Sequence, residues 1–198
     1  MRVEQLQEEF SIEVEWRPFE LHPSASGGPS QGIDRGKDRS GQRDAYFERL
    51  RALGEEAGLT FQPPTLVPNS QRALEAAEFA REQGAFAPYH RALFDAYFGQ
   101  GRDIGDVAVL AELGAANGLD ATALKEALAS RRYTSLVDER TEEARRQGVS
   151  GTPTVIFENG ERRFPIVGAQ EYAVFESVAR RMGAESRNKN REPRATRP

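Results

Sequence analysis

The sequence contains no cysteine among its 198 residues. This absence excludes disulfides, cysteine-ligated zinc and thiol nucleophiles. With only His22 and His90 to supply imidazole, a histidine-rich metal site is not expected either. Long apolar runs are also missing, since no stretch approaches the roughly 20 apolar residues of a transmembrane helix. The first ten residues have no signal-peptide core. We therefore expect a cytoplasmic protein with no cofactor and no membrane partner.

The charge of the chain is slightly acidic, with a net charge of −4. Because phosphate binding rests on clustered Lys and Arg, nucleic acid is not expected as the partner. The C-terminal stretch 184–198 is the exception, and we interpret it as a disordered basic tail, with binding of something acidic as the alternative. Its charged residues are Arg187, Lys189, Arg191, Arg194 and Arg197 against Glu185 and Glu192.

The N-terminal region changes its pattern twice. The first ten residues place apolar side chains at helical spacing without a capping residue, which indicates the end of a helix. Ser11–Trp16 alternates apolar and acidic residues, which predicts a half-buried strand with Trp16 in the core. Pro23–Gly41 is rich in Gly, Ser, Pro and charge, so we expect a mobile surface loop.

The middle of the chain carries apolar residues at helical spacing, interrupted by Gly and Pro. Asp44 and Asp120 are suited to cap two of these helices at their N-termini. No fixed period links the segments, so a helical repeat is not expected. The predicted helices are Asp44–Ala57, Ser70 to Gly84, Phe86–Phe98, Asp106–Ala116, Ala121–Ala129 and Thr134–Gln147.

After Gly148 the pattern becomes that of a hairpin. Thr154–Phe157 is continuously apolar, which is typical of a strand buried on both faces. Asn159-Gly160 is a strong hairpin signal, and Arg162–Val167 is the expected partner strand. A final amphipathic helix is predicted over Gln170–Met182.

Five motifs, in order along residues 1–183, resemble the DsbA-like thioredoxin-fold family, and its FrnE branch in particular. The resemblance implies an α/β, thioredoxin-like fold with an all-helical insertion at about 44–147. It also implies a cis Thr152–Pro153 bond and a substrate-binding wall made of Gly151, Thr152 and Pro153. The motifs are Val14 to Leu21, Pro68-Asn69-Ser70, Ala96-Tyr97-Phe98, Gly148 to Thr154 and Val167 to Gln170.

The sequence departs from that family at its beginning. In the family a first strand and a Cys-x-x-Cys segment precede the first helix, and here nothing precedes it. That strand would lie between Ser11–Trp16 and Thr154–Phe157, so we expect those two segments to stay about 9.6 Å apart, twice the strand spacing. Either the coding region starts at an internal Met or the chain is a natural derivative without redox chemistry; the uncapped helix favours the first explanation.

The resemblance implies a thiol–disulfide oxidoreductase or isomerase acting on protein or small thiols, which is redox-inactive as written because it has no cysteine. No catalytic residue is therefore assigned. Two alternatives stay open. One is a relative of the kappa-type glutathione transferases and 2-hydroxychromene-2-carboxylate isomerases, and the other is a non-catalytic peptide-binding module.

The remaining polar candidates have simpler interpretations. His22 is expected to be a solvated loop residue, and His90 to be a packing or surface residue of a helix. Asp103, Asp106 and Glu112 match no metal-binding loop, so we interpret them as helix caps and surface residues.

Overall fold

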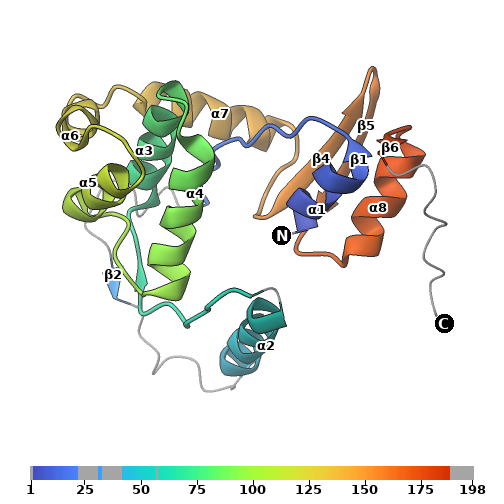
Figure 1. Cartoon of the computed structure of the whole chain (residues 1–198), viewed down its shortest axis with the longest axis horizontal. Coiled ribbons are helices and arrows are strands. Elements are labelled where there is room, and N and C mark those ends of the chain that lie inside the picture. Colours follow the sequence, from blue (N-terminus) through green and yellow to red (C-terminus); the bar gives the residue numbers. More distant parts are fainter. Residues whose placement is uncertain (1, 22–30, 33–41, 57, 188–198) are drawn as a thin grey trace. The chain divides into compact units, whose positions relative to one another are not determined.

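The computed structural model describes residues 2–21, 31–32, 42–56 and 58–187 (Figure 1). The chain forms two compact units. Unit 1 combines the two ends of the chain, Met1–Arg17 and Gly148–Pro198, and unit 2 is the middle segment Pro18–Gln147.

Unit 1 consists of a hairpin, two helices and a short second sheet. A two-residue turn joins the hairpin strands, with Asn159 paired to Arg162 and Gly160 in the left-handed region at φ +60°. The predicted hairpin is thus confirmed. The elements are α1 (Arg2–Glu9), β1 (Phe10–Ser11), β4 (Thr154–Asn159), β5 (Arg162–Val167), α8 (Tyr172–Arg181) and β6 (Glu185–Ser186).

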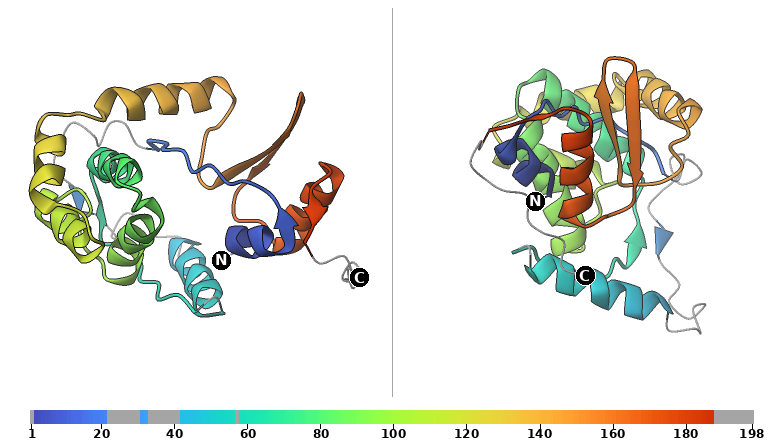
Figure 2. Two further views of the ribbon diagram at one scale, coloured as in Figure 1. Left: turned by 45° about the horizontal axis from the view of Figure 1, so that its top comes forward. Right: turned by 90° about the vertical axis from the view of Figure 1, so that its right-hand side faces the viewer.

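The core of unit 1 lies between the hairpin and the helices α1 and α8, which are seen together in Figure 2. Val155 and Phe157 of β4 pack against this cluster, because residues two apart on a strand point to the same face. The buried members are Leu6, Phe10, Ile166, Phe175, Val178, Ala179 and Met182.

The predicted strand Ser11–Trp16 is largely wrong. Strand pairing ends at Ser11, where β1 meets β6, and Trp16 is 41% exposed instead of belonging to the core. Among the described strands none is bonded to 12–16, and a strand needs a ladder partner for its backbone groups. Ile12 and Val14 are still half-buried and Glu13 is exposed, so the alternation is present without a sheet.

The prediction that Thr154–Phe157 is buried on both faces is also wrong. These four residues are only half-buried, and β4 has one strand neighbour, β5, within the described part of the chain. No ladder joins Ser11–Trp16 to β4 in that part, and the expected separation of about 9.6 Å between the two segments stays a prediction. A strand with a single neighbour lacks the second flank that a central strand has.

The described residues of unit 2 are helical apart from one short strand pair, β2 with β3. β2 lies within the segment that we predicted to be a mobile loop; the rest of Pro23–Gly41 lies outside the described residues, as does His22. The elements are β2 (Gln31–Gly32), α2 (Gln42–Glu56), β3 (Leu66–Val67), α3 (Ser70–Glu82), α4 (Phe86–Phe94), the π-helical η3 (Asp95–Gly99), α5 (Val107–Ala116), α6 (Ala121–Ala129) and α7 (Thr134–Arg146).

The helix boundaries follow local signals closely. Asp106 and Asp120 cap α5 and α6: their side chains accept hydrogen bonds from the N–H groups of Ala108 and Thr122, each at 2.8 Å. Asp44 is not a cap, because α2 begins two residues earlier at Gln42. The single helix expected over Phe86–Phe98 is α4 followed by the π-helical turn of η3.

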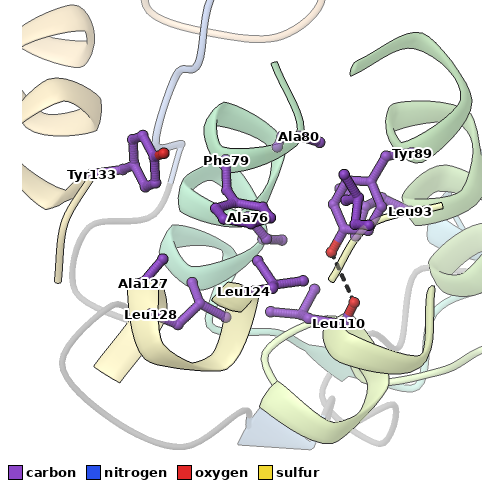
Figure 3. Close-up of a cluster of buried hydrophobic side chains, with 13 residues drawn as sticks. Ala76, Phe79, Ala80, Tyr89, Leu93, Leu110, Leu124, Ala127, Leu128 and Tyr133 are labelled. Atoms are coloured by element: carbon purple, nitrogen blue, oxygen red, sulfur yellow. Dashed lines mark hydrogen bonds between the residues drawn. The ribbon is translucent and has the colours of Figure 1, made fainter. Parts of the chain in front are cut away.

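The core of unit 2 is built around α3 (Figure 3). Small residues such as Ala76 and Ala80 of α3 are fully buried, which lets neighbouring helices approach closely. Tyr89 of α4 is fully buried as well, and its hydroxyl donates to the carbonyl of Leu110 in α5 at 3.0 Å. The other large members of the cluster are Phe79, Leu93, Leu119, Leu124, Leu128 and Tyr133.

The predicted tail is ordered at its start. β6 pairs with β1, and the N–H of Arg187 donates to the carbonyl of Glu9 at 2.9 Å. The guanidinium of Arg187 also donates to the carbonyl of Phe10 at 3.0 Å. Residues 188–198 lie outside the described part. Within the described part, no helix has the length and apolar character needed to cross a membrane.

Candidate peptide-binding site

The candidate site is the segment that joins α7 to β4 in sequence. Gly148 ends α7 with φ +83°, a left-handed conformation that glycine adopts without steric cost. The chain then runs through Gly151, Thr152 and Pro153 into β4, and the Thr152–Pro153 peptide bond is cis, as the resemblance implied. Thr152 and Pro153 are exposed and Gly151 is half-buried. The three predicted wall residues therefore lie next to one another at the surface of unit 1.

Two hydrogen bonds hold this segment in place. The hydroxyl of Thr154 donates to the carbonyl of Gly151 at 2.7 Å. The N–H of Gly168 donates to the carbonyl of Pro153 at 2.8 Å and extends the β4–β5 ladder by one step. Thr152 lies between these two held carbonyls. Its own N–H and C=O make no hydrogen bond within the described residues, so they can pair with another backbone.

Thr154 and Gly168 are contributors that the sequence reasoning missed. Both stand inside motifs that carry the family resemblance, but their roles depend on contacts of backbone carbonyls. A motif shows which residue types occur together and does not show which carbonyl a hydroxyl reaches. The proximity of Thr154 to Gly151, three positions away, was the available signal.

The polar candidates that lie within the described residues have packing or capping contacts. His90 is half-buried, and its ring lies 5.0 Å from that of Phe86 and 4.9 Å from that of Phe94. Burial, together with the charge of Arg81, lowers the pKa of His90, which favours the neutral ring. The packing interpretation of His90 is thus confirmed.

The acidic candidates have structural partners. Asp103 accepts a hydrogen bond from the N–H of Gly105 at 2.8 Å, and Glu112 pairs with Arg102. Together with the cap made by Asp106, these contacts agree with the interpretation as caps and surface residues. Within the described residues no group of three His, Asp or Glu side chains is arranged to hold a metal ion.

Two buried residues of unit 2, Glu75 and Glu20, make hydrogen bonds to residues of α7 that are far away in sequence. Glu75 of α3 accepts a hydrogen bond from the hydroxyl of Thr134 at 2.7 Å, and burial raises the pKa of its carboxyl group. The N–H of Glu20 donates to the hydroxyl of Thr141 at 3.1 Å. Both contacts fasten α7, the helix that leads to the candidate site in sequence.

Comparison with known proteins assigns the family. The family model of the DSBA-like thioredoxin domain matches residues 1–179. The chain belongs to this family. It therefore has an α/β, thioredoxin-like fold with a helical insertion. A curated relative, the uncharacterized protein YwbO of Bacillus subtilis (strain 168), is 32% identical over 170 residues, which cover 84% of this chain and 80% of YwbO.

Two solved structures share the fold of this DSBA-like chain. A probable DsbA oxidoreductase from Streptomyces coelicolor is 23% identical with a TM-score of 0.81, and the match covers 98% of this chain and 85% of that one. A candidate protein disulfide isomerase from Nitrosomonas europaea is 14% identical with a TM-score of 0.56, and the match covers 77% and 80% of the two chains.

Proposed function

We propose that this chain binds an extended polypeptide or thiol substrate along Gly151, Thr152 and Pro153, as the substrate-binding wall of a thiol–disulfide oxidoreductase of the FrnE branch. Thiol–disulfide exchange requires a thiolate that attacks a disulfide sulfur. The 198 residues contain no cysteine, so binding is the part of the reaction that they can perform by themselves.

The observation that carries the proposal is the backbone of Thr152. Thr152 is an exposed residue, its N–H and C=O make no hydrogen bond within the described residues, and the carbonyls of Gly151 and Pro153 on both sides of it are held. A free N–H and C=O on a fixed segment are what an added extended strand pairs with. Because the protein presents these groups already ordered, a peptide loses mainly its own conformational freedom on binding.

The test is a titration of the ¹⁵N-labelled chain with an unstructured octapeptide of alternating valine and serine. We expect the amide signal of Thr152 to shift and saturate. The matched control is the same peptide with every backbone amide N-methylated, which removes all of its N–H donors and places methyl groups along both edges, so it should abolish the shift. Thr152→Ala should bind like the wild type because it keeps the backbone groups. Equal binding of the two peptides, or a Thr152 signal that does not move, would overturn the proposal.

A further inference from the structure

The hydroxyl of Thr154 lies next to the wall formed by Gly151, Thr152 and Pro153. It donates to the carbonyl of Gly151 at 2.7 Å, and Thr154 itself is the first residue of β4, paired with Val167 of β5. The donor therefore stands on a strand with a fixed register, and the acceptor lies on the loop. This contact anchors the loop to the hairpin.

The acceptor matters because of the geometry of the peptide unit. The C=O of Gly151 and the N–H of Thr152 belong to the same planar trans peptide and point in opposite directions. Fixing the carbonyl of Gly151 therefore fixes the direction of the Thr152 N–H. A hydrogen bond to that carbonyl also polarises the peptide unit, which makes its N–H a better donor.

The other flank of Thr152 is held without a hydroxyl. The carbonyl of Pro153 accepts from the N–H of Gly168, whose φ of +82° turns the chain sharply after β5. The side-chain amide of Gln170 donates to the carbonyl of Val167 at 3.0 Å and braces this turn. The two flanks of Thr152 therefore differ. The Pro153 side is held by the N–H of Gly168 and supported by the side-chain amide of Gln170, whereas the Gly151 side is held by the hydroxyl of Thr154.

We infer that Thr154 is a positioning residue, whose hydroxyl aims the N–H of Thr152 at the backbone of a bound peptide. This inference rests on the proposed function. A valine at 154 keeps the branched shape and the strand preference but removes the donor. The net worth of one hydrogen bond corresponds to a loss of about 2- to 10-fold in peptide affinity.

The experiment compares the 198-residue wild type with Thr154→Val and Thr154→Ser, using the valine–serine octapeptide. Thr154→Val should bind about 2- to 10-fold more weakly, and Thr154→Ser should restore the affinity because it restores the hydroxyl. Thr122→Val makes the same chemical change at an exposed position of α6 and should leave the affinity unchanged. The carbonyl ¹³C signal of Gly151 should move in Thr154→Val and return in Thr154→Ser.

The binding measurements distinguish the positioning role of Thr154 from the proposed binding function. If the wild type binds the peptide and Thr154→Val binds equally well, the positioning role is wrong while the binding function stands. If the wild type does not bind, the proposed function fails, and this inference fails with it. If Thr154→Val does not fold, Thr154→Ala is used instead. The inference would also be overturned if Thr154→Ser bound weakly although its Gly151 carbonyl ¹³C signal matched that of the wild type.

Discussion

Removing the hydroxyl of Tyr89 should cost unit 2 a measurable but limited part of its stability. Tyr89 is fully buried, and its hydroxyl donates to the carbonyl of Leu110 at 3.0 Å. Burial raises the pKa of Tyr89, so the phenol remains a donor throughout the neutral range. Tyr89→Phe deletes this one hydrogen bond and leaves the ring in place.

The expected loss of stability in Tyr89→Phe depends on whether the carbonyl of Leu110 still accepts another hydrogen bond. Leu110 lies inside α5, Val107–Ala116, where its carbonyl also accepts the N–H four residues later. Because the carbonyl is not left without a partner, we expect a loss of about 1 kcal/mol, the net value of one hydrogen bond. Removing the whole ring in Tyr89→Ala should cost about 3–5 kcal/mol, because a cavity is added.

Tyr97 offers a matched control. Its hydroxyl also donates to a leucine carbonyl, that of Leu66 at 2.9 Å, but Tyr97 is only half-buried. Water can replace the lost partner there, so Tyr97→Phe should cost less than about 0.5 kcal/mol.

The assay is urea unfolding followed by circular dichroism at 222 nm, with thermal unfolding as a second measure. A loss of 1 kcal/mol corresponds to a fall of about 2–4 °C in Tm for a chain of this size. Equal losses for the two tyrosine variants would refute the reasoning, since burial would then have no influence. A loss above about 3 kcal/mol in Tyr89→Phe would also refute it, because the hydroxyl alone could not account for such a value.

Three further predictions concern acid, cap and thiol chemistry. The pKa of Glu75 is raised in the folded state, so the folded state binds this proton more tightly than the unfolded state and loses stability as the pH rises from about 4. Glu75→Gln should therefore be more stable than the wild type at neutral pH. In urea unfolding, the difference in stability should vanish below about pH 4. Asp120→Ala should cost about 1 kcal/mol because the N–H groups of Thr122 and Ala123 lose their acceptor, whereas Asp120→Asn should lose little; equal losses would argue against the cap. The purified 198-residue chain should reduce no insulin disulfide above background, because it has no sulfur nucleophile; turnover that persists after repurification would contradict this.

Local patterns determined much of the fold from the sequence alone. The caps at Asp106 and Asp120 and the turn at Gly160 were predictable because each depends on residues within a few positions. Such signals need no knowledge of distant segments. The wall Gly151–Pro153 was a prediction of a different kind, since it came from the resemblance of a short motif to the DsbA-like family.

The tertiary structure decided the features that depend on contacts between segments far apart in the sequence, namely strand pairing and long-range hydrogen bonds. Ser11–Trp16 has the alternation of a strand but pairs only at Ser11, because a ladder requires a neighbouring strand that the pattern does not specify. The contact between Glu75 and Thr134 joins residues 59 positions apart, and that between Glu20 and Thr141 joins residues 121 apart. No periodicity encodes such pairs, since burial and hydrogen bonding across the chain arise only when distant helices pack.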